Sequence, residues 1–497
     1  MTTNNQTSEN KETENKEFLE DIERRVQIFG NLVEKCGMDR KKYQEDGVKW
    51  CLVNELRTEP PANVRGGFIA DEMGLGKTIM MIGLFVANMM PRNLIILPPI
   101  LIEQWISQIE RMTGHTPIVF HGKNKKYITI QQLQRAPIVI STYNAISVSN
   151  KGLTPLHEVK WNRIVFDEGH HLRNSKTSRL NGAILLKGRI RYIVSGTPIQ
   201  NNKQDFYNLC KAIKMPTSFY TNPDNLLIIA RNFILKRTKK SVGICLPDVV
   251  LTNAVVLWQN LKEKELSEGI HAVLGMASQD KIDAVGEALI AQGSRVFRAL
   301  TRSKQTCILP KMLTPMFDAF VQKGIMNNYE EYKEALSYSS KLDTVANAIL
   351  NNKGNGCGKL VFCHFHEEID ELRKKLDKGG IDKIATFDGR LNHTFRQQTL
   401  DDGYEVLILQ IQTGCEGLNL QDKYSEIYFV SPHWNPAVED QAVARCHRIG
   451  QTKTVYVFRF NMENFDITTN NDKTLDNHIL RIQDDKRSIA DSVIHTD

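Results

Sequence analysis

The 497-residue chain has nine cysteines but no Cys-x-x-Cys pair. Pairs of this kind mark most small zinc and redox sites, so their absence predicts neither a zinc site nor a disulfide framework. No run of about 18 apolar residues occurs, and no membrane-spanning helix is expected. The first 16 residues also lack the apolar segment of a secretory signal. Together these absences favour a reducing, intracellular compartment.

The composition is that of an ordinary globular protein. Hydrophobic residues make up 41% and charged residues 24% of the chain, which excludes a disordered chain, a collagen and a disulfide-stabilised miniprotein. The 64 basic and 57 acidic residues give a net charge of +7. This excess is compatible with a polyanionic partner, but it is equally typical of a solvated surface. The length is too great for one hydrophobic core, so two or three domains are expected.

The first half of the chain has the pattern of an α/β domain. Residues 1–24 are polar and mixed in charge, and they are predicted to be a disordered leader. Over 25–250, helical stretches alternate with short apolar runs at 93–98, 137–142, 163–166 and 191–195. Near-continuous apolar runs bounded by turns are typical of buried strands in a parallel sheet. With helices on both faces, this predicts a doubly wound α/β domain.

The second half repeats this organisation after a helical interruption. Residues 251–340 are rich in helix formers and predict a helical insertion. Apolar runs return at 359–363, 405–409, 426–430 and 455–458, which predicts a second α/β domain over 341–465. In the tail, 466–497, four apolar residues share one face of a predicted helix, which is therefore expected to dock. These residues are Leu475, Ile479, Ile482 and Ile489.

A phosphate-binding loop is predicted between a strand ending near Ile69 and a helix beginning near Ile79. Gly74 and Gly76 allow the backbone to fold closely around phosphates, while Lys77 supplies a cation. The hydroxyl of Thr78 is placed to hold Mg²⁺. The strict form of this motif has glycine where the chain has Asp71, so a simple glycine-rich turn before a helix is the alternative.

Two carboxylates, Asp167 and Glu168, come directly after the apolar run at 163–166. Mg²⁺ prefers hard oxygen ligands, and an attacking water needs a positioned base. We therefore predict that Asp167 serves a metal and that Glu168 serves a water molecule. A solvated pair of surface carboxylates is the alternative.

In the second domain, the segment 440–451 places Arg445 and Arg448 three residues apart, on one face of a predicted helix. Arginines in this arrangement can stabilise the charge that develops on a transferring phosphoryl group. The alternative is a basic surface helix. Three histidines, His121, His364 and His366, lack the spacing of metal ligands and are predicted to be structural.

Taken in order, these motifs resemble those of the Swi/Snf-type, superfamily 2 helicase-like ATPases. Tyr43 and Gln44 with Gly47 and Trp50 resemble the adenine-reading Q motif of that family. Further segments resemble its P-loop (71–78), DEAH box (167–170), motif III (195–202), a segment peculiar to the Swi/Snf type (234–239, with 246–247), the Trp-Asn-Pro segment (434–440) and motif VI (440–451).

This resemblance implies two RecA-like lobes that bind ATP and Mg²⁺. The nucleotide-binding residues it implies are Gln44, Asp71, Glu72, Met73, Gly74, Leu75, Gly76, Lys77 and Thr78. The catalytic residues it implies are Lys77, Asp167, Glu168, Gln441, Arg445 and Arg448, with Thr78 and Asp167 holding the metal.

The same resemblance implies an ATP-dependent translocase on double-stranded DNA that remodels protein–DNA complexes or regulates transcription. Among Swi/Snf-type proteins, the chain resembles most the global transactivator proteins of baculoviruses. That likeness implies a viral protein in the host nucleus, with chromatin or transcription proteins as partners and with neither a membrane nor a zinc partner. Two alternatives remain open, a strand-separating DNA helicase and an ATPase-inactive transcriptional scaffold.

The chain departs from the family pattern in two places. Gly169 replaces the alanine of the DEAH box, and motif V has Gln412 and Cys415 at two altered positions. The altered motif V bears on how this segment contacts DNA and couples the lobes. The DNA contacts that the resemblance implies are Pro98–Trp105, Ser141–Tyr143, Arg173 and Asn419.

Overall fold

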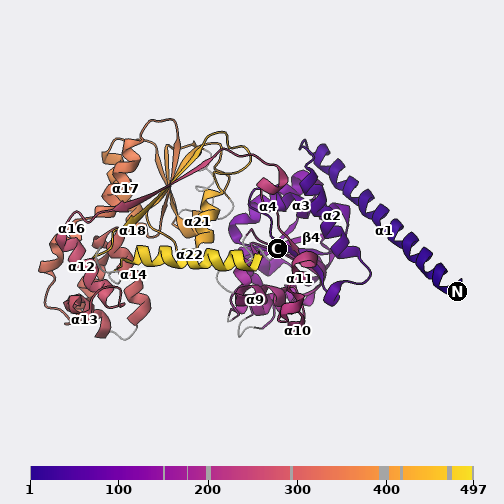
Figure 1. Ribbon diagram of the computed structural model, residues 1–497, viewed down its shortest axis with the longest axis horizontal. Coiled ribbons are helices and arrows are strands. Elements are labelled where there is room, and N and C mark those ends of the chain that lie inside the picture. Colours follow the sequence, from indigo (N-terminus) through magenta and orange to yellow (C-terminus); the bar gives the residue numbers. More distant parts are fainter. Residues whose placement is uncertain are drawn as a thin grey trace. The chain divides into compact units, whose positions relative to one another are not determined.

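The computed structural model describes residues 2–148, 152–175, 177–196, 203–291, 295–390, 402–414, 418–466 and 473–494. Of residues 2–13, 295, 413–414 and 489–494 it describes the backbone alone. The chain divides into two compact units (Figure 1). Unit 1 comprises Met1–Cys245 with Ile489–Asp497, and unit 2 comprises Leu246–Ser488.

Unit 1 is built on a seven-stranded sheet in the order β3-β4-β2-β5-β6-β1-β7, and every pairing in it is parallel. Between β5 and β6 the register runs to Asp167 opposite Val194. The strands are β1 Arg65–Ile69, β2 Asn93–Leu97, β3 Ile118–Phe120, β4 Ile138–Thr142, β5 Lys160–Asp167, β6 Lys187–Val194 and β7 Ile234–Leu235. All four runs predicted from the sequence in this half are strands.

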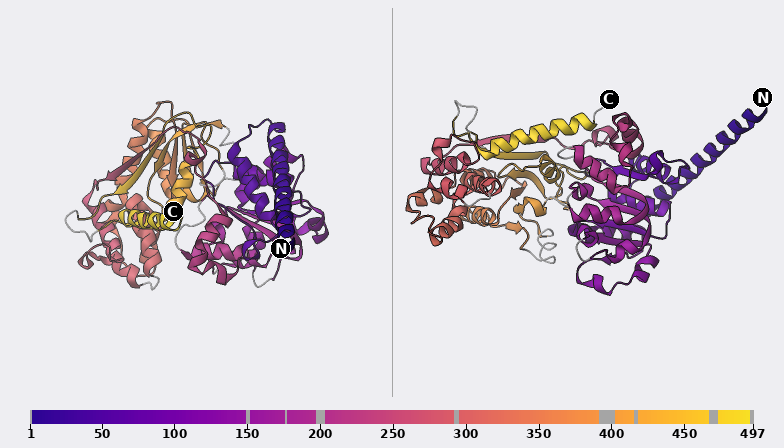
Figure 2. Two further views of the ribbon diagram at one scale, coloured as in Figure 1. Left: turned by 45° about the vertical axis from the view of Figure 1, so that its right-hand side comes forward. Right: turned by 90° about the horizontal axis from the view of Figure 1, so that it is seen from below.

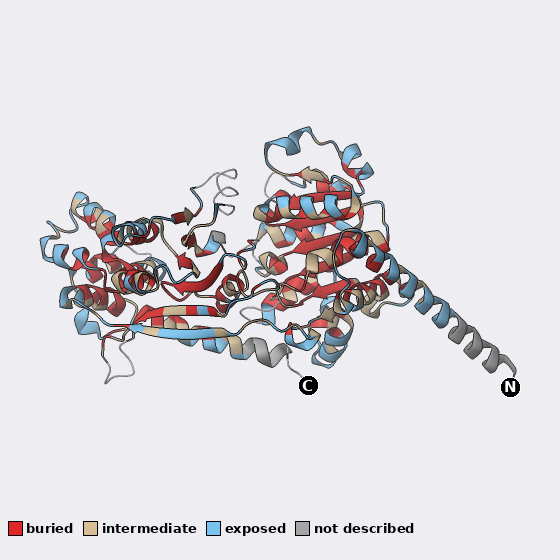
Figure 3. Cartoon of the chain, turned by 90° about the horizontal axis from the view of Figure 1, so that it is seen from above, coloured by how far each residue is buried: buried red, intermediate tan, exposed pale blue. Residues whose placement is uncertain are grey.

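Both faces of this sheet are buried. In β2, Leu94 and Ile96 face one apolar cluster, whereas Ile95 and Leu97 face the other. This two-sided burial explains the unbroken apolar runs, because successive side chains of a strand point to opposite faces. Figure 3 shows the strands as mostly buried and the helices as exposed on their outer sides. The covering helices are α2 Lys42–Leu56, α3 Lys77–Ala87, α4 Ile102–Thr113, α5 Ile130–Arg135, α6 Tyr143–Ile146, α7 Pro155–Glu158, α8 Ser178–Leu185, α9 Lys203–Ala212, α10 Thr217–Tyr220 and α11 Leu226–Phe233.

The N-terminal segment differs from the disordered leader expected over 1–24. Thr2–Lys35 forms one helix, α1. Its side chains Ile22, Val26, Phe29 and Val33 are buried in the same cluster as α2 and α3. These residues lie three or four apart and so share one helical face. The first residues are polar, so nothing in the sequence indicated the helix there. The helix packs on unit 1 through the apolar face of its later residues.

Unit 2 contains a six-stranded sheet in the order β10-β11-β9-β12-β13-β8, again parallel throughout. Its strands are β8 Val249–Val256, β9 Gly358–Cys363, β10 Ile384–Phe387, β11 Val406–Gln410, β12 Tyr424–Phe429 and β13 Val455–Met462. The four runs predicted in this half form β9, β11, β12 and β13. The strand β8 lies where the sequence predicted the start of the helical insertion. It was not predicted, because its side chains at 250–253 are exposed and do not form the apolar run of a buried strand.

Between β8 and β9 the chain is helical and has an apolar cluster of its own. This cluster contains Leu266, Ile270, Leu289, Phe317 and Phe320. The helices of this segment are α12 Leu261–Ala272, α13 Ala284–Ala291, α14 Arg295–Ile308, α15 Thr314–Gln322, α16 Lys333–Ser337 and α17 Ser340–Asn351. Later in the unit follow α18 His366–Lys378, α20 Ile411–Gly414, α21 Pro436–Val443 and α22 Leu475–Ile494.

The predicted fold class, two doubly wound parallel-sheet units with a helical segment between the core motifs, is confirmed. Two further views show helices against both faces of each sheet (Figure 2). Among the helices described, none combines the length and the apolar character that crossing a membrane requires. In the same part of the chain, no group of three or more His, Cys, Asp or Glu side chains is arranged to hold a metal ion.

Candidate active site

The predicted phosphate loop lies between the end of β1 and the start of α3. Gly74 (φ 93°) and Gly76 (φ 80°) both adopt the left-handed conformation that glycine tolerates best. A Cβ atom at Gly76 would lie 2.3 Å from Nε2 of Gln44, so the close approach of the Q-motif helix also requires glycine there. Since Gly76 caps α3, the free N–H groups of the first helical turn adjoin the loop.

The loop is held from within by its lysine and from α2 by a glutamine. Nζ of Lys77 donates to the carbonyl oxygens of Asp71 (2.8 Å) and Glu72 (3.4 Å). Nε2 of the buried Gln44 donates to the carbonyl oxygen of Leu75 at 3.1 Å. Thr78 is the second residue of α3 and is half-buried. The structure therefore places Gln44 and the whole segment 71–78 together, as the motif predicts.

Motif III begins next to this loop. A Cβ atom at Gly196, just after β6, would lie 3.2 Å from Cγ of Met73. Ser195 is fully buried, and its backbone N–H donates to the carbonyl oxygen of Ile69 at 3.1 Å. The rest of the predicted motif, residues 197–202, lies outside the described residues.

The loop also has partners that the sequence did not suggest. Asp71 is fully buried, and the guanidinium of Arg237 donates to both of its carboxylate oxygens, with Nε at 3.0 Å from Oδ1. Next to this pair, the carboxylate of Glu72 accepts from the backbone N–H of Lys239 (2.8 Å) and pairs with its ammonium (2.9 Å). One feature of the sequence pointed to these partners. Asp71 stands where the strict motif has glycine, and a carboxylate that is buried in a loop needs a basic partner.

Asp167 ends β5 at the same edge of the sheet as the phosphate loop, because all the strands run parallel. Its carboxylate is buried and accepts from the indole N–H of Trp105 at 2.7 Å and from the backbone N–H of Glu168 at 3.0 Å. Burial and the neighbouring charge of Glu168 raise the pKa of Asp167, and the charge of Lys77 opposes this rise. A divalent cation would stabilise the same carboxylate, so the site fits a metal ion.

Glu168 occupies an unusual backbone conformation. Its φ of 49° lies in the left-handed region, which few residues other than glycine adopt. Its Oε2 atom lies 3.3 Å from Nδ1 of His170, and its side chain is 16% exposed. Strained backbone that persists in a folded protein is concentrated at functional sites, and its position here agrees with the predicted catalytic role.

Two of the DNA contacts implied by the family resemblance have a different role in this structure. Trp105 and Tyr143 are 1% and 3% exposed, which leaves almost no surface for a DNA partner. Instead, the Trp105 indole binds the Asp167 carboxylate, and the Tyr143 hydroxyl donates to the Asp167 carbonyl oxygen at 2.6 Å. Both aromatic residues therefore fix the orientation of Asp167.

In unit 2, the helix predicted to present the arginines is shorter than expected. α21 ends at Val443, so Gln441 is helical and buried, whereas Arg445 and Arg448 lie in the turns that follow. The prediction of one shared helical face is therefore wrong. After the helix, the backbone forms turns with hydrogen bonds between residues three apart. In one of them, the Cys446 N–H donates to the Val443 carbonyl oxygen at 3.0 Å.

The turns after α21 are organised by motif V and by a buried glutamine. Arg448 donates to the side-chain oxygen of Asn419, and the N–H of Leu420 donates to the Arg445 carbonyl oxygen at 3.2 Å. Nε2 of Gln451 donates to the carbonyl oxygens of Gln421, Tyr424 and Cys446 at 2.9, 3.1 and 3.3 Å. Of the two altered motif V positions, Gln412 is exposed and Cys415 lies outside the described residues.

The charges of Arg445 and Arg448 interact with each other. Burial and the charge of Arg445 lower the pKa of Arg448. Nε of Arg445 is buried and has no hydrogen-bond partner among the described residues. An unsatisfied buried donor is costly, so Nε of Arg445 can accommodate a further hydrogen-bond acceptor.

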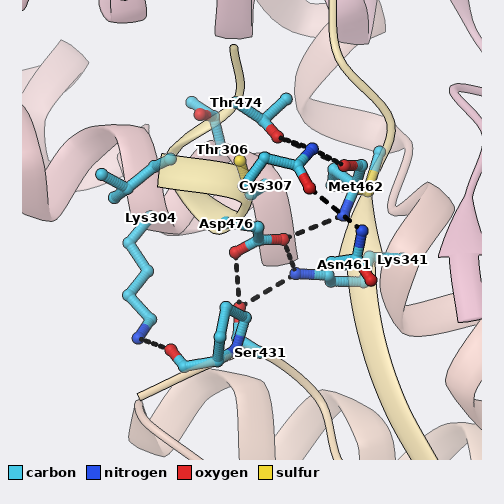
Figure 4. A network of polar contacts seen from close by, with 12 residues as sticks. Lys304, Thr306, Cys307, Lys341, Ser431, Asn461, Met462, Thr474 and Asp476 are labelled. Carbon is cyan, nitrogen blue, oxygen red and sulfur yellow. Dashed lines mark hydrogen bonds and ion pairs between the residues drawn. The ribbon is translucent and has the colours of Figure 1, made fainter. Parts of the chain in front are cut away.

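The loop before α21 is held by α22 through buried polar contacts. Asp476 of α22 and Lys341 of α17 form a fully buried ion pair, and both bind the hydroxyl of Ser431 (Figure 4). Nζ of Lys304 in α14 donates to the carbonyl oxygen of Pro432 at 2.9 Å. The strand end at 431–432 is thereby fixed by three helices.

Further along α22, Gln483 donates to Oε1 of Glu439 at 2.7 Å, and Lys486 donates to the Trp434 carbonyl oxygen at 2.7 Å. Of the four apolar residues predicted on the docking face, Leu475 and Ile479 are fully buried, Ile482 is half-buried, and the side chain of Ile489 lies outside the described residues. The predicted docking helix therefore contacts the Trp-Asn-Pro segment and α21 within unit 2.

A parallel α/β unit with a P-loop and paired carboxylates, followed by a second such unit with clustered arginines, is typical of helicase-like proteins. Comparison with protein-family models agrees. The SNF2-related domain matches residues 43–312, more than half of the chain, and the helicase conserved C-terminal domain matches residues 340–450. The chain belongs to the SNF2-related family.

Among curated proteins, the chain is 26% identical to an uncharacterized ATP-dependent helicase of Mycoplasma genitalium, over 92% of the chain and 42% of that protein. It is also 26% identical to the ATP-dependent DNA helicase DDM1 of Arabidopsis thaliana, over 85% of the chain and 59% of that protein. The chain thus spans less than two thirds of either relative.

A solved structure of the Sulfolobus solfataricus SWI2/SNF2 ATPase core in complex with dsDNA is 22% identical to the chain. The match covers 91% of this chain and 92% of that one, with a TM-score of 0.38.

The glycine that replaces the DEAH-box alanine can be tested. A Cβ atom at Gly169 would lie 2.4 Å from Cγ2 of Ile193 in β6. We expect Gly169→Ala to lower the free energy of unfolding by about 1–3 kcal/mol, because the buried methyl group overpacks this contact. Urea denaturation measures the change.

The control is the same substitution in an Ile193→Ala background. Because Ile193→Ala removes the opposing methyl group, Gly169→Ala should cost less there than in the wild-type chain. Equal stability of Gly169→Ala and the wild type would show that the sheet relaxes without strain at this contact.

Proposed function

We propose that the chain is an ATP-dependent translocase on double-stranded DNA, of the Swi/Snf type. The observation that carries the proposal is the arrangement in unit 1. There, Lys77 on a P-loop and the carboxylates Asp167 and Glu168 lie at the same edge of one parallel sheet, in a chain of the SNF2-related family.

ATP and Mg²⁺ fit the residues of this edge. The ammonium of Lys77 and the amides of the first turn of α3 would hold the phosphates, and Gln44, bonded to the loop at Leu75, would read the adenine. Mg²⁺ usually keeps few protein ligands together with phosphate oxygens. The Thr78 hydroxyl and the buried Asp167 carboxylate would be those ligands. The bound metal would supply charge stabilisation at the phosphates.

Glu168 would accept a proton from the attacking water. It follows the carboxylate proposed to bind the metal directly, and its Oε2 atom lies 3.3 Å from Nδ1 of His170. A carboxylate that is partly exposed can exchange this proton with solvent.

Arg445 and Arg448 would stabilise the charge that develops on the phosphoryl group. The argument for this role of the two arginines is electrostatic. The two guanidinium groups lie close enough for Arg445 to lower the pKa of Arg448, and Nε of Arg445 lacks a partner among the described residues. An anion bound between them would relieve both costs. Gln441, buried on α21, would complete this side of the site.

The first experiment separates binding from turnover. We expect Lys77→Ala to abolish tight nucleotide binding, because it removes the cation that faces the phosphates. We expect Glu168→Gln to bind nucleotide normally and to lose at least about 100-fold in turnover, because it removes the general base. Nucleotide titration and steady-state hydrolysis measure the two effects, and wild-type turnover in Glu168→Gln would refute the role of Glu168.

The second experiment concerns unit 2. We expect Arg448→Ala to lower turnover by about 10³-fold while ATP affinity stays within a few-fold of the wild type. Arg448→Lys should restore activity only in part, because an ammonium lacks the planar fork of a guanidinium.

Arg373→Ala, which removes an exposed arginine of α18 paired with Asp377, is the matched control and should leave turnover within about twofold. If Arg448→Ala behaves like this control, Arg448 is a surface residue without a catalytic role.

The DNA partner and the biological setting belong to the same proposal. Duplex DNA is supported by family membership and by the net charge of +7. Remodelling of protein–DNA complexes or regulation of viral transcription, inside a host nucleus, would follow if the chain is a relative of the baculovirus global transactivators. Chromatin or transcription proteins would then be its partners.

The third experiment distinguishes a translocase from a strand-separating helicase. We expect duplex DNA to stimulate ATP hydrolysis, with a salt dependence typical of phosphate contacts and with little sequence preference. The protein should displace a triplex-forming third strand but should not unwind a forked duplex. Efficient fork unwinding would favour the helicase. Hydrolysis that duplex DNA does not affect would contradict the translocase, and a complete lack of hydrolysis would favour the scaffold.

A further inference from the structure

Four side chains outside the predicted catalytic set form a clamp on the P-loop. Asp71 and Glu72 belong to the loop, and Arg237 and Lys239 belong to the segment after β7. We call these four residues the P-loop clamp. The two halves are separated by about 166 positions in the sequence, yet both of the acidic residues pair with a basic residue of the other half.

The Asp71 carboxylate has no exposed surface, so water cannot neutralise it. Arg237 does so with two of its nitrogen atoms, one on each carboxylate oxygen, while its own side chain stays 16% exposed. This two-point contact fixes the direction as well as the distance of the pair, which a single point charge could not do.

The same guanidinium reaches a third element. It donates to the carbonyl oxygen of Tyr43 at the start of α2, and its carbon lies 5.9 Å from the centre of the Tyr43 ring. A Cβ atom at Gly47 would lie 2.7 Å from Nη2 of Arg237, so the absence of a side chain there leaves room for the arginine. Arg237 therefore joins the Q-motif helix, the P-loop and the segment after β7.

Backbone contacts extend the clamp along the loop. The N–H of Ala70 donates to the carbonyl oxygen of Leu235 (2.7 Å), and the N–H of Glu72 donates to that of Arg237 (2.9 Å). The carbonyl oxygens of Asp71 and Glu72 are in turn the acceptors of Lys77. The clamp thus sets the position of the two backbone groups that hold the P-loop lysine.

We propose that Arg237 is a positioning residue for nucleotide binding, acting through Asp71 on the shape of the P-loop and on the place of Lys77. The proposal rests on the function proposed above. The contact with Arg237 also explains why Asp71 stands where the strict motif has glycine. A glycine would leave only the backbone bonds between the loop and this segment, whereas the aspartate adds a two-point contact with the Arg237 side chain and, through it, with α2.

The test is Arg237→Lys, which keeps the charge but loses the fork. We expect the KM for ATP and the dissociation constant of a fluorescent ATP analogue to rise about tenfold, while kcat stays within about twofold of the wild type. A residue that only supported the fold would lower kcat with the amount of folded protein and would leave KM unchanged.

The matched control is Arg163→Lys. Arg163 forms a fully buried two-point pair with Glu55 in the same unit, with Nε at 2.6 Å from Oε1, and contacts no residue of the P-loop. We expect this variant to lose thermal stability without a change in KM. A tenfold rise in KM for Arg163→Lys as well would show that any loss of a buried pair has this effect, and it would overturn the proposal.

A second variant, Asp71→Asn, removes the buried charge and preserves the shape of the side chain, so it is expected to fold. It should raise KM in the same direction, and the double variant should bind ATP no more weakly than the weaker single variant, because both changes break one interaction. Wild-type KM in Arg237→Lys or Asp71→Asn, or additive effects in the double variant, would refute the role of Arg237. If the wild-type chain itself neither binds nor hydrolyses ATP, the proposed function fails instead.

Discussion

Parallel pairing is the constraint on which the candidate site depends. In a parallel sheet, all strands end at the same edge, so the segments that follow β1, β5 and β6 must meet there. The phosphate loop, the pair Asp167–Glu168 and the start of motif III are these three segments, and β6 lies between the other two strands. Strand order therefore brings together Asp71 and Ser195, which lie more than 100 positions apart in the sequence.

Two buried aspartates lie at this edge of the sheet in unit 1, and their negative charges are compensated by different kinds of partner. Asp71 pairs with a permanent cation, Arg237, at two points, so it has little capacity for another partner. Asp167 receives an indole N–H and a backbone N–H, while its burial and the charge of Glu168 next to it raise its pKa. A carboxylate in that state is stabilised by an added cation. The contrast separates the aspartate that shapes the loop from the aspartate suited to hold a metal ion.

Sequence patterns were sufficient for the parts of the fold that local physics determines. The apolar runs marked eight of the strands because burial on both faces leaves no polar positions, as Leu94 to Leu97 show. The P-loop was recognisable because its glycines are required by backbone geometry at Gly74 and Gly76. The strand β8 was not predicted, because its exposed residues do not form an apolar run.

The contacts that complete the site could not be predicted in this way. Trp105 lies 62 positions from Asp167, and Arg237 lies 166 positions from Asp71, so no spacing rule connects them. Periodicity also misplaced Arg445 and Arg448, since α21 ends at Val443 and the chain continues in turns, where the Cys446 carbonyl oxygen accepts from Gln451. Local patterns determine the elements, whereas charge balance in the interior determines which distant side chains support the reacting groups.

The clamp also has a consequence for how the two units are connected. Lys239 is followed by a short turn at Lys240–Val242, and unit 2 begins at Leu246. The connection between the units therefore starts at residues bonded to Asp71 and Glu72, whose carbonyl oxygens hold Lys77. A displacement of the loop would therefore act, through the clamp, on the segment that leads into unit 2.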